Sequence, residues 1–318
     1  MSMHAVVGNG PVGRAVVRVL RAQGQDVRLV SRRPAMPDDQ GVELIRADAT
    51  SPAELANALH GADVVYNCAN APYHRWPQDL PAIWNGIQSA AEATGARLVI
   101  ASNLYAYGRP GGAITAGDEF APCSRKGTVR AELEKQALQA HENGTLQVAI
   151  VRASDFYGPE VRESVLGERF FGSVAAGKPA QLYGSRDAPH SYTYVEDFAR
   201  TLVAVGGGQE ADIWGRSWVV PNDKPRTVDE LEALLRSHRP GARVQVMGGL
   251  MLRLGALFVP AAPEMIEMLY EFTEPFIADG SETTARLGVE PTALSDGLDV
   301  TLAWYTGSRD AQEATTNE

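Results

Sequence analysis

A glycine-rich segment near the amino terminus constrains the fold of this chain more than any other feature. The segment Gly8-Asn9-Gly10-Pro11-Val12-Gly13 has the pattern G-x-G-x-x-G, after a short apolar run and before apolar residues at helical spacing. Between a strand and a helix, such glycines permit a tight turn, close approach of a pyrophosphate to the backbone and close helix–strand packing. The start of the helix adds free N–H groups and a positive dipole end. The sequence therefore predicts a dinucleotide site.

The pattern that follows predicts a doubly wound α/β fold with a parallel sheet, because short β-branched runs alternate with helical patterns through residue 155. Strands are expected at residues 5–7, 27–30, 42–47, 64–67, 98–101 and 146–152. One helix is expected to start in the glycine segment and to stop at Gly24. A second is expected after Ser51, which with Glu54 has the spacing of a capping box, and a third over residues 131–141.

Beyond residue 155 the pattern becomes irregular, with a helix expected at 194–205, a short strand at 218–220 and a helix after the Thr227–Glu230 capping box. We therefore expect a Rossmann-type domain at residues 1–155, to which residues 185–220 return. A smaller, mainly helical substrate-binding region is expected at residues 156–184 and 221–318. The apolar stretch from Leu250 to Val259 is expected to form a buried helix, a lid or part of an apolar substrate pocket.

Charge and cysteine content limit the partners. With 29 Lys and Arg against 39 Asp and Glu, the formal net charge is −10, which argues against nucleic acid and anionic membranes. Two cysteines are too few for a disulfide framework, and the first residues lack the features of an export signal. The histidines lack metal-site spacing, so no metal is expected. We expect a cytoplasmic monomer or homodimer with a small-molecule substrate.

The end of the second expected strand indicates which dinucleotide binds. An NAD-preferring site places an acidic side chain there to hold the ribose hydroxyls, whereas this chain has Ser31, Arg32 and Arg33. Guanidinium groups form paired hydrogen bonds with phosphate oxygens, which suits a 2′-phosphate. The sequence thus favours NADP(H), with NAD(H) still possible. The alternative is that both arginines are ordinary solvated surface residues.

Further motifs, in a consistent order along the chain, resemble the extended short-chain dehydrogenase/reductase superfamily, in particular its NAD(P)-dependent epimerase/dehydratase group. They are Ala47-Asp48-Ala49-Thr50, Asn67-Cys68-Ala69-Asn70, Ala101 to Gly108, Arg152 to Pro159, His190 to Asp197, Leu287-Gly288, Pro291-Thr292, Gly297-Leu298 and Trp304-Tyr305. The resemblance implies that the Asp48 segment meets the adenine. It also implies that Cys68, Ala69, Asn70 and Ser154 lie along the cofactor.

The usual catalytic set of that group, a Ser or Thr on the fifth-strand loop and a Tyr-x-x-x-Lys, is not matched. The hydroxyl position falls on Asn103, preceded by Ser102, and the tyrosine and lysine positions fall on Lys126 and Arg130. Arginine does not titrate usefully, so Arg130 is expected to hold cofactor ribose or phosphate. Lys126, beside a like charge, is one candidate base, and the phenol of Tyr105 is another. The alternative is that both cations are solvent-exposed or bind phosphate.

Two segments are expected to border the substrate. Tyr73, His74 and Trp76 follow the fourth strand, and His190 and Tyr192 lie in the segment that returns to the sheet. Together these features predict an NADP(H)-dependent oxidoreductase for a hydroxyl- or carbonyl-bearing small molecule, without the usual catalytic set. Two alternatives stay open. One is an epimerase or dehydratase without net redox change, and the other is a catalytically degraded protein that senses the cofactor or serves as a scaffold.

Overall fold

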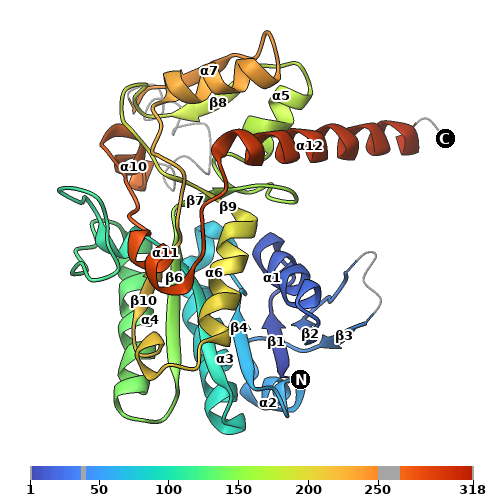
Figure 1. Ribbon diagram of the computed structural model, residues 1–318, viewed down its shortest axis with the longest axis vertical. Coiled ribbons are helices and arrows are strands. Elements are labelled where there is room, and N and C mark those ends of the chain that lie inside the picture. The colour runs from blue at the N-terminus through green and yellow to red at the C-terminus, as the bar shows by residue number, and fades with distance from the viewer. Residues whose placement is uncertain (1, 37–40, 250–265, 317–318) are drawn as a thin grey trace.

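A computed structural model describes residues 2–36, 41–249 and 266–316, with side chains up to residue 309 (Figure 1). Its centre is a seven-stranded sheet in the order β10-β6-β5-β4-β1-β2-β3, in which every neighbouring pair is parallel. The strands are β1 (Met3–Val7), β2 (Asp26–Ser31), β3 (Val42–Arg46), β4 (Val64–Asn67), β5 (Arg97–Asn103), β6 (Val148–Ala153) and β10 (Ser217–Val219). The predicted doubly wound sheet is confirmed. Its strand order reverses between β1 and β4, where open α/β sheets bind ligands.

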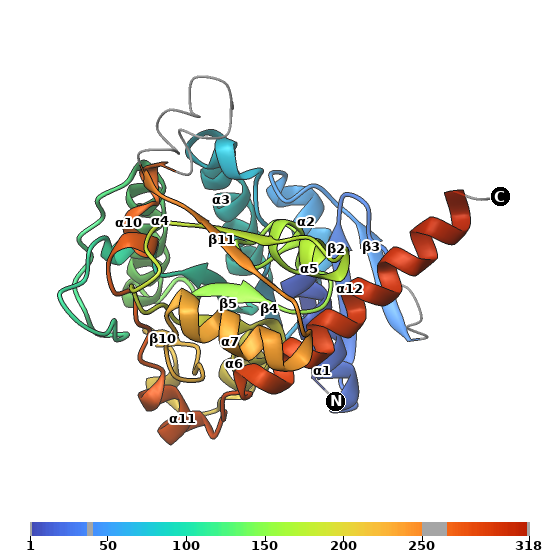
Figure 2. The ribbon, with the colours of Figure 1, turned by 90° about the horizontal axis from the view of Figure 1, so that it is seen from above.

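Helices cover both faces of the sheet (Figure 2). Helices α1 (Pro11–Ala22) and α6 (Val195–Gly207) pack on one face, and α2 (Pro52–Leu59), α3 (Trp76–Thr94) and α4 (Arg125–Glu142) pack on the other. Each interface is a continuous apolar cluster of strand and helix side chains. Strands of a parallel sheet are apolar on both faces for this reason.

Helix α3 is not predicted by the sequence patterns. Pro77 and Pro81, which normally indicate a break, lie in the first turn and inside this helix. A proline in the first turn costs little, because the N–H there has no partner within the helix. The buried side chains of Trp76, Trp84 and Ile87 pack α3 against the core. We infer that this packing outweighs the hydrogen bond lost at Pro81.

The two predicted capping boxes have different outcomes. At the start of α7 (Val228–His238), the Thr227 hydroxyl accepts from the Glu230 amide, and the Glu230 carboxylate accepts from the Thr227 amide, so this box is confirmed. Helix α2 does begin after Ser51, but the predicted box there is wrong. The Ser51 side chain makes no cap hydrogen bond. The reciprocal bond is also absent, because the Ser51 amide donates to the carbonyl of Asp48 at 3.0 Å and the Glu54 carboxylate accepts from the amide of Asp48 at 3.1 Å.

The remaining elements lie over the carboxyl ends of the strands (Figure 1). They are the parallel pairs β7 (Asp155–Tyr157) with β9 (Tyr192–Tyr194) and β8 (Ala180–Tyr183) with β11 (Val244–Met247), and the helices α5 (Ser173–Ala175), α10 (Tyr270–Thr273) and α12 (Leu294–Thr316). Helix α11 (Ser281–Leu287) instead packs beside β10 and α6. The apolar stretch from 250 to 259 falls outside the described residues, and the predicted domain boundaries stay predictions. No helix in the described ranges is long and apolar enough to cross a bilayer.

Candidate functional site

The glycine turn between β1 and α1 has the shape of a pyrophosphate cradle. Gly8 has a φ of 117°, and a Cβ there would lie 2.6 Å from the backbone carbonyl atoms of Cys68. A Cβ on Gly13 would lie 2.0 Å from the carbonyl oxygen of Gly8, whereas one on Gly10 would meet nothing within 4 Å. Two glycines therefore allow backbone packing, and the third faces open space at the start of α1. The residues present fit a dinucleotide phosphate at this helix terminus.

The segment after β2 is hydrogen-bonded to this turn. The side-chain amide of Asn9 donates to the backbone carbonyl of Arg33 at 3.0 Å, and the backbone amide of Arg33 donates to the Ser31 hydroxyl at 3.2 Å. The side chains of Arg32 and Arg33 are exposed. Their exposure fits both the predicted role at the ribose end of the site and the alternative of ordinary surface arginines.

The other predicted adenine contacts lie after β3. The Asp48 carboxylate accepts from the amide and the hydroxyl of Thr50, both at 2.9 Å. These hydrogen bonds, with a smaller contribution from Arg32, lower the pKa of Asp48. A Cβ on Gly86 of α3 would lie 2.2 Å from the carbonyl of Ala49, so this loop packs directly on that helix. An ionised carboxylate therefore lies near the predicted adenine end.

The predicted motif after β4, which includes Cys68, lies against the glycine turn. The Cys68 amide donates to Val7 at 2.9 Å, which continues the β1–β4 pairing beyond the strands. The Asn67 side chain accepts from the amide of Ala69 at 3.2 Å, and that of Asn70 from the amide of Ala71 at 3.0 Å. The backbone of this motif thus lines the point at which the strand order reverses.

Two tyrosines meet beyond the ends of β4 and β5. Tyr73 lies in the turn η1 (Tyr73–Arg75) and Tyr105 in the turn η2 (Tyr105–Tyr107), and their phenol oxygens are 3.5 Å apart. Lys126, in the first turn of α4, places its Nζ 4.4 Å from the centre of the Tyr73 ring. Tyr73 is 36% exposed and therefore reachable from solvent. Three elements thus bring two phenols and one cation together.

Arg130 is a buried cation on an aromatic surface. Its guanidinium lies 4.3 Å from the Trp76 ring and 5.5 Å from the Trp84 ring. Burial lowers the pKa of Arg130 to about 10, although the Glu134 carboxylate opposes the shift. Arg130 is 4% exposed and Lys126 only 1%, so the alternative that both are solvent-exposed is wrong. The aromatic partners come from α3, which the sequence patterns do not predict.

Lys126 has an acidic partner that the sequence does not indicate. Its Nζ lies 3.2 Å from one carboxylate oxygen of Glu267, and its backbone amide donates to the other oxygen at 3.0 Å. Burial acts to raise the pKa of Glu267, but the contacts with Lys126 outweigh it and hold that pKa below its ordinary value. Glu267 therefore presents an ionised carboxylate to Lys126.

Ser102 belongs to a buried ionic network instead of facing the crevice. Its hydroxyl donates to the Glu134 carboxylate, which also accepts from the Arg152 guanidinium at 2.7 Å. Arg152 in turn donates to the Tyr107 hydroxyl. Buried charges require such partners, because an unpaired one is strongly destabilising. The Ser102 hydroxyl, predicted beside the catalytic hydroxyl position, is therefore committed to this network.

Two other predicted residues hold backbone in place. The Asn103 side chain accepts from the amide of Tyr105 at 3.2 Å and thereby orients η2. The Ser154 hydroxyl is buried and donates to the carbonyl of Ser191 at 2.7 Å. Both residues lie at strand ends, where these contacts orient η2 and the backbone at Ser191.

The residues predicted to border the substrate divide into two groups. Near Tyr73, the His74 side chain is exposed and Trp76 is buried beneath Arg130. His190 and Tyr192 are buried together, with ring centres 4.8 Å apart. Asp155 and Glu271 lie next to His190 and are not among the predicted site residues. Glu271 could have been noticed in the sequence as an acidic residue inside an apolar stretch.

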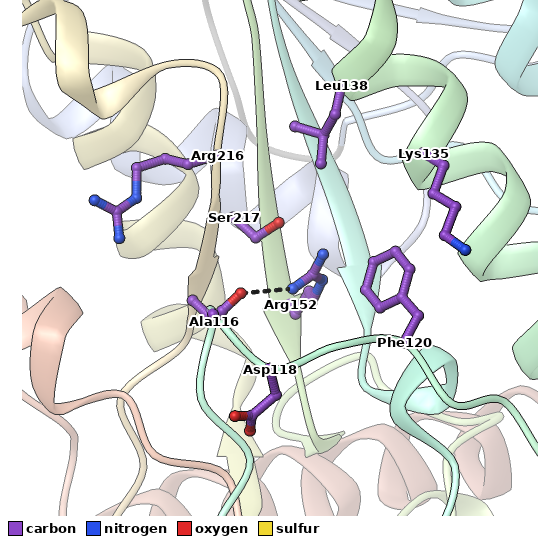
Figure 3. A pocket seen from close by; sticks show the side chains of 9 residues that line it. Ala116, Asp118, Phe120, Lys135, Leu138, Arg152, Arg216 and Ser217 are labelled. Atoms are coloured by element: carbon purple, nitrogen blue, oxygen red, sulfur yellow. Dashed lines mark hydrogen bonds between the residues drawn. The ribbon is translucent and has the colours of Figure 1, made fainter.

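An open hollow of about 390 Å³ lies elsewhere, beside β6, β10 and α4 (Figure 3). Arg152 reaches into it, donating to the carbonyl of Ala116 at 3.4 Å and lying 4.8 Å from the centre of the Phe120 ring. Its rim carries Lys135 and Asp118, but none of the predicted site residues lines it. We therefore place the candidate site at the carboxyl ends of β1, β4 and β5 and not in this hollow.

Comparison with known sequences identifies relatives. The sequence model of the NAD dependent epimerase/dehydratase family matches residues 5–220. A Bacillus subtilis protein described as an uncharacterized UDP-glucose epimerase is 24% identical over 165 residues, which are 49% of this chain and 52% of that protein. A probable UDP-glucuronate 4-epimerase of Rhizobium meliloti is 23% identical over 288 residues, 85% of this chain and 80% of that protein. The first match thus spans about half the length of the relative.

Solved structures share the fold. UDP-glucuronic acid 4-epimerase of Bacillus cereus in complex with NAD has a TM-score of 0.78 and 18% identity, covering 96% of this chain and 99% of that one. A dTDP-glucose 4,6-dehydratase of Streptomyces venezuelae with NAD bound has a TM-score of 0.77 and 21% identity, covering 97% and 98%. The sequence match extends over the whole nucleotide-binding sheet, from β1 to β10. This chain therefore belongs to the NAD-dependent epimerase/dehydratase family of enzymes.

Proposed function

We propose that this protein uses NAD(P) to oxidise a hydroxyl-bearing, sugar-like molecule transiently and then returns the reducing equivalent to the same molecule. Epimerisation or elimination would result, without net redox change. The names of the relatives support this alternative over the net oxidoreductase favoured by the sequence alone. The observation that carries the proposal is the cluster of Tyr73, Tyr105 and Lys126 at the same sheet edge as the glycine turn.

The residues that would hold the cofactor are those of the glycine turn, the segment after β2 and the Asp48 loop. When bound, a nicotinamide supplies the acceptor and donor of hydride. The protein's part is to bind and orient the substrate and to manage charge and protons at its oxygen atom.

Tyr105 is the group that we assign to proton transfer. Burial raises the pKa of Tyr105, with further contributions from Tyr73, Glu271 and Asp155, so its phenol is protonated at neutral pH. In the reduction step the phenol gives its proton to the carbonyl oxygen and becomes a phenolate, and in the oxidation step that phenolate accepts the proton of the substrate hydroxyl. Tyr73 is its hydrogen-bonding neighbour. Lys126 acts as a fixed cation that stabilises negative charge on these oxygens.

A turnover experiment tests this function. The protein is incubated with NAD(P) and a panel of UDP- and dTDP-linked sugars, and products are followed by NMR while the absorbance of reduced nicotinamide is recorded. We expect an epimer or a dehydrated product, with no accumulation of reduced cofactor. Reduced cofactor formed in step with product would support the net oxidoreductase instead. Tight cofactor binding without turnover of any sugar would support the sensor or scaffold alternative.

A second, finer proposal is that NADPH binds more tightly than NADH. Its support is the exposed pair Arg32 and Arg33 at the end of β2. Replacing both by alanine should weaken NADPH binding by about 10- to 100-fold per lost charged hydrogen bond, with little effect on NADH. Calorimetry measures both affinities. Arg169→Ala, which removes an exposed arginine outside the segment after β2, is the matched control and should change neither affinity. Equal affinities of the unaltered protein for the two cofactors would end this proposal.

A further inference from the structure

Glu267 reaches from the C-terminal region to the start of α4. One of its carboxylate oxygens, Oε1, accepts from the backbone amide of Lys126 at 3.0 Å, and the other, Oε2, lies 3.2 Å from the Lys126 Nζ. The Arg125 guanidinium is 3.5 Å from Oε2, but its side chain is 70% exposed and therefore contributes little. A single carboxylate thus holds both the backbone and the side chain of Lys126.

The chain beside Glu267 is anchored on the turn η2. Met268 and Tyr270 are buried. They share one apolar cluster with Leu104, which precedes η2, and with Tyr107, which ends it. Side chains packed in such a cluster have little room to move. The backbone that carries Glu267 is therefore held next to η2, and its carboxylate reaches α4 from a fixed direction.

The start of α4 packs against the same turn. A Cβ on Gly127 would lie 2.4 Å from the backbone carbonyl oxygen of Tyr105, so the glycine permits this close approach. The Ser124 hydroxyl accepts from the Gly127 amide at 3.0 Å, and Glu267 accepts from the amide of Lys126. The first turn of α4 therefore has two acceptors for its free N–H groups, and the helix dipole further favours a carboxylate there.

Lys126 requires such a partner to act as a fixed cation. A lysine side chain is long and flexible, and it samples many rotamers unless its ammonium is bound. Lys126 is also buried, and a buried ammonium without an anionic partner is strongly destabilising. Glu267 supplies the carboxylate and leaves the Nζ 4.4 Å from the centre of the Tyr73 ring. The phenol oxygen of that ring is 3.5 Å from the phenol oxygen of Tyr105.

We propose that Glu267 is a positioning residue, which holds the ammonium of Lys126 beside the phenols of Tyr73 and Tyr105. Glu267 belongs to the predicted substrate-binding region, whereas the three residues that it serves belong to the predicted Rossmann-type domain. The C-terminal region therefore completes the cluster, in addition to any contact that it makes with the substrate. The inference rests on the proposed function, in which Lys126 is the fixed cation, and names the residue that places this cation.

Amine labelling tests the positioning without any substrate. The full chain is treated briefly with acetic anhydride, and acetylated lysines are located by peptide mass spectrometry. Lys126 should react slowly in the unaltered protein and about tenfold faster in Glu267→Gln, because loss of a buried ion pair favours local opening. The exposed Lys178 should react at the same rate in both proteins and serves as the internal control. Equal labelling of Lys126 in the two proteins would overturn the proposal.

Glutamine is chosen because it separates the charge from the capping of α4. Its amide oxygen can still accept from the Lys126 backbone, while its NH₂ group, a donor, then faces the Nζ. We expect turnover on a confirmed substrate to fall by about 10- to 100-fold, as for a displaced catalytic group, with unchanged NAD(P) affinity. Glu282→Gln, which removes a carboxylate from the ion pair with Arg216, is the matched control and should keep full turnover. Full turnover in Glu267→Gln would mean that Glu267 is only a helix cap.

A double-mutant cycle shows whether Glu267 acts through Lys126. In Lys126→Met the ammonium is absent, so adding Glu267→Gln should lower turnover by less than about twofold more. A further loss as large as in the unaltered background would contradict the proposal. Glu267→Asp, which keeps the charge on a shorter side chain, should give intermediate labelling and turnover, and it replaces the glutamine variant if that protein does not fold. If the unaltered protein converts no sugar, the proposed function fails, and the labelling of Lys126 still decides whether Glu267 holds the ammonium.

Discussion

Gly13→Val is expected to abolish binding of NADH and NADPH alike. A Cβ at this position would lie 2.0 Å from the carbonyl oxygen of Gly8, which is backbone and cannot rotate away as a flexible side chain would. The start of α1 would have to move away from β1, and its N–H groups would no longer face the phosphates together. A β-branched side chain adds further bulk at the same point. Isothermal calorimetry with each cofactor measures the loss, and circular dichroism reports whether the sheet is retained.

Two other glycine variants make this result specific. Gly10→Ala should fold like the unaltered protein, because a Cβ there meets no atom within 4 Å, but it should still weaken both cofactors by filling the space that the pyrophosphate needs. Gly111→Ala, which also meets nothing within 4 Å and lies outside the crevice, should change neither property. Unchanged cofactor affinity in a folded Gly13→Val protein would mean that the motif is only a turn.

The sheet could be predicted because its signals are local. Each of its strands from β1 to β6 is a β-branched run of a few residues, and the run of glycines between Gly8 and Gly13 identifies the first crossover without knowledge of any distant contact. The capping box at Thr227 is local as well, since both partners lie within one helical turn. At Ser51 the reciprocal bond of the box is missing, because the Ser51 amide and the Glu54 carboxylate both bond to the backbone of Asp48, just outside the motif.

The candidate site could be predicted only in part, because its decisive contacts join distant segments. Tyr73, Tyr105 and Lys126 could be named from their places after strands or in a motif, but their clustering depends on how η1, η2 and α4 pack. Glu267 lies 141 positions from Lys126, and no local pattern connects them. The burial of Arg130 also required Trp76 and Trp84 on α3, a helix hidden from sequence patterns by its prolines.

Tyr105→Phe is expected to lower turnover by about 10²- to 10⁴-fold without changing cofactor affinity, as for removal of a group that moves a proton at the reacting oxygen. The phenylalanine keeps the ring that packs 5.9 Å from Trp76, so the fold of η2 should be preserved. Tyr73→Phe should have a smaller effect, because the oxygen of Tyr105 would remain. Tyr194→Phe removes a phenol from β9, away from this pair, and should leave turnover unchanged. Steady-state rates on a confirmed substrate and calorimetry with NAD(P) provide the two measurements.

The pH profile distinguishes Tyr105 from Lys126. Because burial raises the pKa of Tyr105, a reaction whose oxidation step needs the phenolate as base should become faster from neutral pH far into the alkaline range, without an inflection near neutrality. Lys126→Met removes the fixed cation and should lower turnover while leaving the shape of that profile unaltered. A profile that loses an inflection near or above neutrality in Lys126→Met would instead make the lysine the titrating group. If both Tyr105→Phe and Lys126→Met retain full turnover, the proton must move through another residue, and His74, which follows Tyr73 in the sequence, or His190 is then the group to replace.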